Sequence, residues 1–453
     1  MFGAGTDRRR PDLIIQDEMH LISGPLGSLV GMFETMVEEI CTKKDSNGNV
    51  IRRPKIIAST ATTRNTLNLI KQLYARTVKT FPVSGVRYSD NFFSHVLKYS
   101  ESKRLYMGLA PTGHSASELE IRSIAAEIVA KEKMISEYLS EIGVDIKNKK
   151  AVYNAISINS HLIKDIDNYW SLVLYYMNLK SLGRTHSRMG QEILANVESM
   201  RAYLYEYPAL NFVTNGFQTR TEEFTSRQES SRIKSLLVEA ESAPELVPSP
   251  MHNISVKYNM DIVQATNMIS VGIDIARWNV MFMVGQPLTT AEYIQSSSRV
   301  GRTTHGLVVN IYNSIRNREL SFYENYVPYH QEFYKFVEPL TATTFTPITL
   351  EKLIYNLYLC YMGAVLGHDR PSCISAKDIN GFKDIMINRN AVITSNDVLR
   401  DFIDDKIDEI HEYFTDPARN NSKFSILLNE TDLNARVMNS LRDIESNTYI
   451  KYE

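Results

Sequence analysis

The sequence has few cysteines and no long hydrophobic run, and both shortages limit what the protein can be. Its three cysteines, Cys41, Cys360 and Cys373, lie far apart and form no CxxC pair, which argues against a disulfide framework and a zinc site. No apolar stretch approaches the ~20 residues that a membrane span needs, and the N-terminus lacks the hydrophobic segment of a secretory signal. We therefore expect a cytoplasmic protein that does not contact a membrane.

The sequence also lacks an excess of charge of one sign. Lysine and arginine number 50 against 52 acidic residues, which gives a formal net charge of -2. No global basic field therefore attracts nucleic acid, and any such binding must come from a local groove. Hydrophobic residues make up 43% of the 453 residues, and neither glycine nor proline is enriched, which is typical of a globular protein with two or three domains.

Two stretches alternate between strand and helix patterns. The first is a strand, a helix and a strand, at residues 12–16, 27–44 and 56–58. The second contains strands and a helix at residues 261–266, 280–287, 291–302 and 306–313. This alternation predicts an α/β fold with parallel sheets, and the periodicity beyond residue 330 predicts a mainly helical C-terminal region.

The stretch PDLIIQDEMHLISG (residues 11–24) ends a short apolar strand in two acids, Asp17 and Glu18. An aspartate at a strand end can hold Mg²⁺ through water, because that ion prefers oxygen ligands and keeps its waters. An adjacent glutamate can orient the water that attacks a γ-phosphate. The alternative is structural: the acids would simply cap the element that follows the strand.

Three further stretches favour the nucleotide interpretation. Thr60-Ala61-Thr62 follows the strand at 56–58, and its hydroxyl groups are suited to hydrogen-bond a neighbouring acidic loop. ATNMISVGIDI begins at residue 265, and QSSSRVGRT at residue 295 carries Arg299 and Arg302. We expect these arginines on one helical turn, projecting the same way, where planar guanidinium groups make bidentate contacts with phosphate oxygens.

In this order and spacing, the four stretches resemble the motifs of superfamily 2 helicases and translocases. DEMH is similar to motif II, TAT to motif III, ATNMISVGID to motif V and QSSSRVGR to motif VI. PDLIIQDEMHLISGPLG and QPLTTAEYIQSSSRVGRT resemble more narrowly the bacterial DISARM-type phage-defence helicases with a DUF1998-like tail. The resemblance implies two RecA-like lobes with ATP bound between them and nucleic acid across their tops.

We expect three regions along the chain. Residues 1–95 would be a partial first RecA-like lobe with motifs II and III. Residues 96–320 would be the second lobe, with motifs IV to VI and a helical insertion at 115–165. Residues 321–453 would be a mainly helical extension, packed against the second lobe or against a partner.

The resemblance implies roles for the residues of motifs II and III. Asp17 would be the acid on the Mg²⁺ side, also serving as the metal contact through water, and Glu18 would be the catalytic base. His20 would couple the nucleotide site to the second lobe. Thr60 and Thr62 would link hydrolysis to movement.

It implies roles for motifs V and VI as well. Thr266 would touch the nucleic-acid backbone, and Gly272 and Asp274 would line the nucleotide side of motif V. The residues expected to face the γ-phosphate are Gln295, Arg299 and Arg302. The expected cofactors are ATP and Mg²⁺, and the expected partners are single-stranded or duplex nucleic acid, with DNA preferred, and subunits of a defence complex.

Two features depart from the family pattern. Ser298 stands where many members have glycine before the first arginine, which leaves the local turn open. The phosphate loop G-x-x-x-x-G-K-[ST] has no match in the sequence. We therefore expect a chain that lacks the front of its first lobe, exposes apolar residues on the strand at 12–16 and does not turn over ATP unaided.

Two functions remain open at this point. The first is an ATP-dependent helicase or translocase motor core whose first lobe is incomplete in this chain. The alternative is a catalytically silent helicase-like module that binds nucleic acid or a partner subunit. A gene whose upstream part is encoded separately would also explain the missing loop.

Aromatic residues are concentrated at residues 322–336, within the stretch SFYENYVPYHQEFYKF that begins at residue 321. Such side chains can stack on unpaired bases. At this spacing they more often pack a helix against a core, and we expect packing here.

Overall fold

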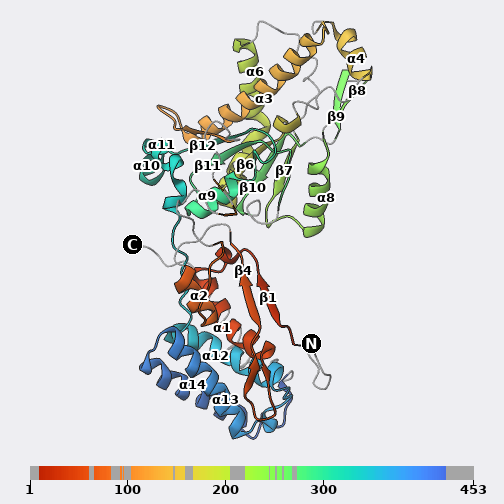
Figure 1. The fold of residues 1–453 in the computed structure, drawn as a ribbon. Helices are drawn as coiled ribbons and strands as arrows, with labels where there is room; N and C mark the ends of the chain where they lie inside the picture. The colour runs from red at the N-terminus through yellow and green to blue at the C-terminus, as the bar shows by residue number, and fades with distance from the viewer. Residues whose placement is uncertain are drawn as a thin grey trace. The chain divides into compact units, whose positions relative to one another are not determined.

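The computed structural model describes residues 10–60, 66–82, 92–93, 95, 104–145, 148–158, 167–204, 220–243, 245–249, 253–257, 260–267 and 273–424. Contacts divide the chain into two compact units. Unit 1 combines residues 1–84 with residues 338–453, and unit 2 comprises residues 85–337 (Figure 1). Among the described residues, no helix is long and apolar enough to cross a membrane.

Unit 2 is built on a six-stranded sheet in which every neighbouring pair is parallel. The strand order is β5-β12-β11-β6-β10-β7. The bounds are β5 (Arg104–Leu109), β6 (Leu172–Tyr176), β7 (Thr221–Phe224), β10 (Ile262–Ala265), β11 (Val280–Val284) and β12 (Gly306–Ile311). The strands at 261–266, 280–287 and 306–313 and the α/β class predicted from the sequence are confirmed.

Helices cover both faces of this sheet (Figure 1). On one face lie α3 (Ala116–Glu141), α5 (Leu179–Arg188) and α6 (Leu194–Leu204), with a π-helical turn at Met189–Ile193. On the other lie α8 (Ser230–Glu241), α9 (Thr290–Ser297) and α11 (Tyr326–Gln331). The remaining elements of the unit are α4 (Lys149–Ile158), the 3-10 turns Asp167–Tyr169 and Phe333–Phe336, the hairpin β8 (Glu245–Ser249) and β9 (Asn253–Lys257), and α10 (Asn317–Glu324).

The central strand β6 shows why its sequence forms a buried strand. All five of its residues are buried, as expected for a parallel strand with helices on both sides. Leu172, Leu174 and Tyr176 belong to the core under α3, and Val173 and Tyr175 belong to the core under α8 and α9. Because successive side chains of a strand point to opposite faces, β6 contributes side chains to both cores.

The sheet of unit 1 that carries the acid pair has two parallel strands, β1 (Leu13–Gln16) and β4 (Lys55–Ala58). One face packs against the core around Leu69 and Leu73. The other face is open: Leu13 is 46% exposed and Ile15 is 69% exposed. The prediction that this strand exposes apolar residues is confirmed, and such a surface favours association with another chain segment.

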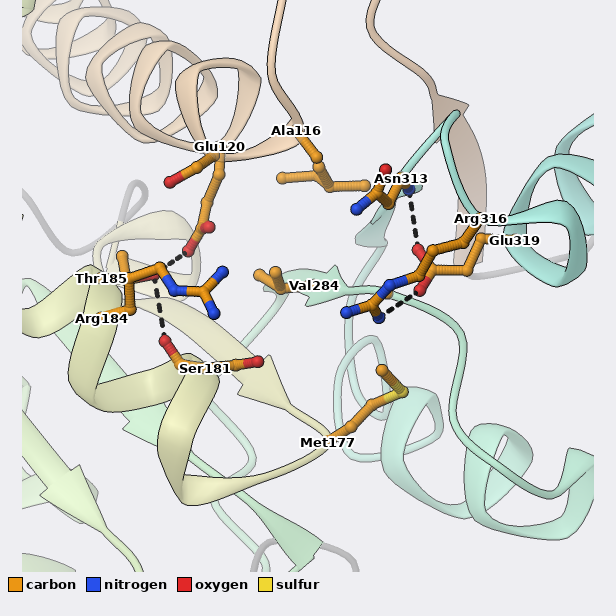
Figure 2. A pocket seen from close by; sticks show the side chains of 13 residues that line it. Ala116, Glu120, Met177, Ser181, Arg184, Thr185, Val284, Asn313, Arg316 and Glu319 are labelled. Atoms are coloured by element: carbon orange, nitrogen blue, oxygen red, sulfur yellow. Dashed lines mark hydrogen bonds and ion pairs between the residues drawn. The ribbon is translucent and has the colours of Figure 1, made fainter. Parts of the chain in front are cut away.

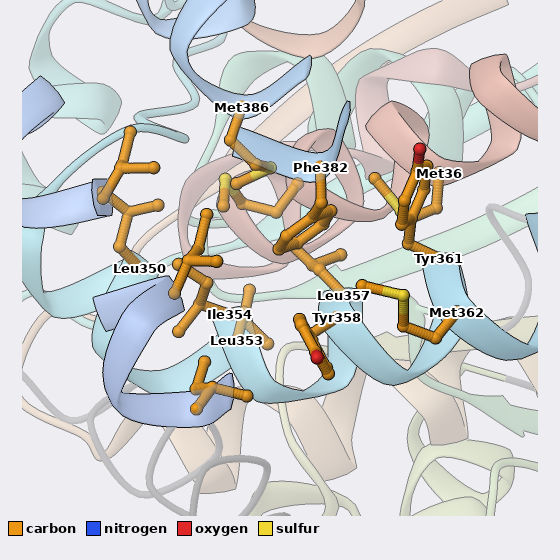
Figure 3. Close-up of a cluster of buried hydrophobic side chains, with 14 of the residues drawn as sticks. Met36, Leu350, Leu353, Ile354, Leu357, Tyr358, Tyr361, Met362, Phe382 and Met386 are labelled. Atoms are coloured by element: carbon orange, nitrogen blue, oxygen red, sulfur yellow. The ribbon is translucent and has the colours of Figure 1, made fainter. Parts of the chain in front are cut away.

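Helices from both ends of unit 1 share one hydrophobic core (Figure 3). Met32 and Met36 of the N-terminal segment pack against Leu353, Leu357 and Phe382 of the C-terminal segment. The helices are α1 (Gly24–Cys41), α2 (Thr66–Tyr74), α12 (Pro347–Cys360), α13 (Ala376–Ile393) and α14 (Asp397–Thr415). Shorter elements are the 3-10 turns Met19–Leu21 and Pro371–Cys373, the hairpin β2 (Lys43–Lys44) and β3 (Val50–Arg52), and the π-helical turn Tyr361–Val365. The mainly helical C-terminal region predicted from the sequence is confirmed.

The segment that returns to unit 1 lies directly on α1. The N–H of Gly24 donates to the carbonyl of Thr341 at 2.7 Å, and the Thr344 hydroxyl donates to the carbonyl of Gln72 at 3.1 Å. Gly31 on α1 has no side chain at this contact, and a Cβ there would overlap the methyl group of Thr344. The close approach of the two segments therefore requires glycine at position 31.

A charged cluster around Glu38 of α1 joins the same elements. Its carboxylate pairs with Arg389 of α13 at 3.1 Å, Arg76 at 2.8 Å and Arg53 at 3.6 Å. Arg389 is buried, donates also to the carbonyl of Leu73 at 2.6 Å, and burial lowers the pKa of its guanidinium. Because a buried guanidinium requires a counter-charge, Glu38 stabilises the junction of α1 with α13.

Glu38→Gln should therefore destabilise unit 1 strongly. The change leaves Arg389 buried without its counter-charge, for which we expect a loss of about 3–5 kcal/mol in the free energy of unfolding. Urea unfolding followed by circular dichroism measures the loss. Glu39→Gln on the same helix removes the more exposed pair with Lys44 and should cost no more than ~1 kcal/mol. Equal effects of the two changes would contradict this assignment.

Unit 2 holds a mostly apolar cavity of about 440 Å³ between α3 and strands β5, β11 and β12, and Glu127 lines it. Among the described residues, Oε2 of Glu127 has no hydrogen-bond partner. Burial raises the pKa of this carboxyl to about 7, although the charge of Lys131 opposes the shift. The folded protein therefore binds this proton more tightly than the unfolded chain does.

This shift makes the stability of unit 2 depend on pH. Because the folded pKa is raised, the stability is full below the ordinary value of 4.5 and falls as the pH rises toward 7. Glu127→Gln should stabilise the unit by about 2 kcal/mol at pH 8 and by much less at pH 5. Thermal unfolding at both pH values measures the difference. The exposed Glu137→Gln on the same helix should show the wild-type pH dependence.

Candidate functional site

In unit 1, parallel pairing brings the acid pair next to the residues that follow β4. Strand β1 ends at Gln16 and β4 ends at Ala58, so Asp17 meets Ser59. The Ser59 hydroxyl donates to Oδ1 of Asp17, and the N–H of Glu18 donates to the same oxygen at 2.8 Å. The N–H of Met19 donates to the carbonyl of Ser59 at 2.9 Å, which fixes the loop to the neighbouring strand.

These contacts determine the charge of Asp17. The hydrogen bond from Ser59, and next the one from the backbone of Glu18, hold the pKa of Asp17 below its ordinary value. The side chain is exposed and therefore ionised at neutral pH. An ionised carboxylate with room for water suits Mg²⁺, which binds through one or two carboxylates and keeps most of its waters. In the part of the chain that the structure describes, no cluster of three or more His, Cys, Asp or Glu residues is arranged to hold a metal.

Glu18 and His20 follow in a sharply turned loop. Glu18 has the left-handed conformation, with φ 51° and ψ 44°, which costs a residue other than glycine roughly 1–3 kcal/mol. Met19 anchors the loop because its side chain is buried in the core of unit 1. Nδ1 of His20 lies 3.2 Å from a carboxylate oxygen of Glu18 and 3.4 Å from the hydroxyl of Thr60. The structure thus brings Asp17, Glu18, His20 and Thr60 together, and Thr62 lies outside the described residues.

In unit 2, the motif VI arginines are tied to the end of motif V. Arg299 donates from Nη1 to the carbonyl of Ile273 at 3.0 Å, and Arg302 forms an ion pair with Asp274. The Asp274 carboxylate is 61% exposed, so this pair is accessible to a ligand. The other expected residues are placed as follows: Gln295 is buried in α9, Thr266 is buried directly after β10, and Gly272 lies outside the described residues.

The expectation that both arginines lie on one helical turn is wrong. Helix α9 ends at Ser297, and the arginines occupy the turn that leads into β12. The chain must reverse here: Gly301 has φ +65°, and its N–H donates to Oδ1 of Asn279 at 3.0 Å. Ser298 has an ordinary right-handed conformation, with φ -74°, so the turn does not require glycine at this position.

Gly301→Ala should destabilise this turn and displace the arginines. A Cβ at Gly301 would lie 2.9 Å from Cγ of Arg104 and 3.1 Å from the backbone of Gly306, in a region of φ that favours glycine. We expect a loss of about 1–3 kcal/mol, measured by thermal unfolding. Gly183→Ala in helix α5 meets no atom within 4 Å and should be neutral or stabilising. Similar losses in both variants would contradict the role of the turn.

The aromatic residues after β12 pack against the motif VI helix, as expected. Nδ1 of His330 donates to the carbonyl of Tyr326 at 2.8 Å, so Nε2 accepts from the Tyr293 hydroxyl of α9 at 2.6 Å. Burial lowers the pKa of His330, which favours this neutral form. Tyr329 is buried in the same core, whereas Tyr334 is 66% exposed. The cluster positions α9 and, through it, the turn with the arginines.

Two residues near the site were not predicted from the sequence. Ser59 directly precedes the TAT motif, and Asn279 directly precedes β11, the strand that leads toward motif VI. Asn279 also donates from Nδ2 to the Thr304 hydroxyl at 2.8 Å, so it braces both sides of the arginine turn. The available signal was a polar residue next to an apolar strand: Ser59 follows β4, and Asn279 precedes β11.

Comparison with known proteins finds a matching family and a curated relative. Residues 212–304 match the family described as Helicase conserved C-terminal domain. The chain is 33% identical over 430 residues to the DISARM protein DrmA of Bacillus paralicheniformis, a match that covers 90% of this chain and 34% of that protein. The chain thus spans about a third of the length of this relative.

Solved structures show a more distant likeness. The crystal structure of the DUF1998 helicase MrfA bound to DNA is 13% identical, with a TM-score of 0.46, over 82% of this chain and 38% of that chain. The Mycobacterium smegmatis helicase Lhr bound to ssDNA and AMP-PNP is 11% identical, with a TM-score of 0.42, over 84% of this chain and 36% of that chain.

The matched helicase domain and the DrmA-like sequence define the class of the protein. The chain is similar to helicases of superfamily 2. More narrowly, it is similar to the DISARM protein DrmA, and both resemblances predicted from the sequence are confirmed.

Proposed function

We propose that the chain forms part of an ATP-dependent motor that moves along or separates nucleic acid, with DNA the expected substrate, in defence against phage. One observation carries the proposal: within each unit, charged residues that the resemblance assigns to nucleotide hydrolysis lie close together. Unit 1 carries an ionised Asp17 beside Glu18, and unit 2 carries a turn with Arg299 and Arg302 tied to the end of motif V.

The acid pair of unit 1, Asp17 and Glu18, would prepare the attack on the γ-phosphate. Asp17 would hold Mg²⁺ through water, and the ion, when bound, neutralises charge on the phosphate oxygens. Glu18 would orient the attacking water and accept its proton, and its carboxylate lies 3.2 Å from Nδ1 of His20. The hydrogen bond from Ser59 keeps Asp17 ionised for this role.

The arginines of unit 2, Arg299 and Arg302, would stabilise the transferred phosphoryl group. Planar guanidinium groups suit bidentate contact with phosphate oxygens, and such a contact is worth a large factor in rate. Asp274 holds Arg302 in place by an ion pair that a more strongly charged phosphate can replace. Gln295 would complete this side of the site, and Gly272 and Asp274 would line its motif V edge.

Coupling to nucleic acid would use residues at two strand ends. The contacts of His20 with Glu18 and Thr60 connect the acid loop to the residues after β4, so a change at the acids would be transmitted to this segment. Thr60 and Thr62 would carry that link. Thr266, directly after β10, would contact the nucleic-acid backbone. DrmA is by name a DISARM protein, which supports subunits of a defence complex as partners.

A second function is a catalytically silent module that binds nucleic acid or a partner subunit. The observation that favours it is the sequence, in which G-x-x-x-x-G-K-[ST] has no match. The two functions differ in one measurable property, which is Mg²⁺-dependent binding and hydrolysis of ATP.

The motor function predicts ATP hydrolysis that depends on Glu18 and Arg302. In a phosphate-release assay of the whole motor of which the chain forms part, with single-stranded DNA, Glu18→Gln should lower kcat by about 10²–10⁴-fold and Arg302→Ala by about 10³-fold or more. The exposed Lys133→Gln on α3 is the control and should keep the wild-type rate. Hydrolysis that survives both changes would contradict the assigned roles.

The silent-module function predicts a different pair of results from the same chain. Titration with a fluorescent ATP analogue would show no Mg²⁺-dependent binding, and fluorescence anisotropy would still show binding of labelled single-stranded DNA. Mg²⁺-dependent ATP binding would instead exclude the silent module.

A further inference from the structure

A polar cavity of about 70 Å³ lies at the carboxyl ends of three strands of unit 2 (Figure 2). Its walls come from the ends of β6, β11 and β12 and from the first turns of α3 and α5. One water needs about 10–15 Å³ of such space, so the cavity has room for several oxygen atoms. None of the described residues that line it comes from β10, so it is separate from Thr266.

Two arginines enter this cavity from different elements. Figure 2 shows the guanidinium groups of Arg184, from α5, and Arg316, from the segment after β12, on opposite sides of Val284. Arg316 pairs with Glu319 at 3.0 Å. The guanidinium of Arg184 makes neither a hydrogen bond nor an ion pair within the described ranges of the chain, although its charge opposes the rise that burial causes in the pKa of Glu120. Its donors are therefore available to a ligand.

The two acids of the cavity are already satisfied by the protein. Glu319 is 3% exposed and accepts from the N–H of Asn313 at 2.7 Å as well as from Arg316. Glu120 is also 3% exposed, accepts from the hydroxyls of Tyr176 and Thr185, each at 2.8 Å, and has its pKa raised by burial. Neither carboxyl therefore forms an ion pair with Arg184.

The start of α3 adds further positive potential. Ala116 and Ser117 form the first turn of this 26-residue helix and line the cavity. Among the described residues, the capping Ser115 side chain accepts from the N–H of Glu118 alone, so the N–H groups of the first two helical residues have no capping acceptor from it. N–H groups at a helix start favour an anion. Together with Arg184, they give the cavity donors for more than one oxygen of the same anion.

We propose that this cavity binds a phosphate group, held by Arg184 with support from Arg316 and the start of α3. The phosphate group belongs either to the backbone phosphodiester of a bound nucleic-acid strand or to a free nucleotide. The site does not depend on ATP hydrolysis by the chain, so it stands whether or not the motor function does. If the source is a nucleic-acid strand, contacts on unit 2 extend from the end of β10 across the ends of β6, β11 and β12.

The test compares the wild-type chain with Arg184→Gln. Arg184 is exposed and its guanidinium is unbonded within the described residues, so the change should leave thermal stability unaltered without a ligand. Fluorescence anisotropy with labelled single-stranded (dT)20 tests the nucleic-acid source. We expect binding about fivefold weaker at 0.15 M salt, and a plot of log Kd against log salt whose slope falls by about 1. Thermal stabilisation by inorganic pyrophosphate tests the free-phosphate source and should be lost in the variant.

Matched variants separate the site from general charge. Arg122→Gln removes an exposed arginine of α3 whose ion pair is with Glu118, and it should behave like wild type in both assays. Arg184→Lys keeps the charge without the planar fork and should recover part of the binding. Loss in the oligonucleotide arm alone assigns the phosphate to nucleic acid, and loss in the pyrophosphate arm alone assigns it to a free ligand. The proposal is overturned if Arg184→Gln matches wild type in both arms, or if Arg122→Gln causes the same loss.

Discussion

Parallel strand pairing is the constraint on which the sites of both units depend. In a parallel pair, the carboxyl ends of two strands lie at the same edge, so residues far apart in the sequence meet there. In unit 1 this places Asp17, after β1, against Ser59, after β4. In unit 2 it places the ends of β6, β11 and β12 around one cavity. An antiparallel pairing of the same strands would put these residues at opposite edges.

The acid loop rests on a unit that two distant segments build together. Glu38 balances three arginines, and the one from α13 is buried, so the C-terminal helices are required to keep α1 in place. Helix α1 also supplies Met32 and Met36 to the core of those helices, and Gly31 allows the returning segment to approach. The loop from Asp17 to His20 lies between β1 and α1, and its position therefore depends on residues more than three hundred positions further along the chain.

Local patterns were sufficient to predict much of the candidate site. An apolar run that ends in two acids predicted a strand end at Asp17. A second apolar run followed by hydroxyl residues predicted that Thr60 would lie near an acidic loop. Each of these two signals spans only a few consecutive residues. The helical turn expected for Arg299 and Arg302 was wrong, because the end of α9 depends on Gly301 and on its contact with Asn279, which comes from another strand. Ser59 was missed for a similar reason, since its role appears only when β4 lies beside β1.

The helicase resemblance, the α/β character and the order of the motifs could all be predicted without a structure, because hydrophobic periodicity and short motifs are local properties of the chain. The tertiary structure alone decided which distant groups share a site. It showed that residues 338–453 complete the unit that begins with β1, that Asp274 holds Arg302, and that Arg184 and Arg316 enter one cavity. These contacts follow from sheet order and helix packing, which join residues whose separation in sequence carries no periodic signal.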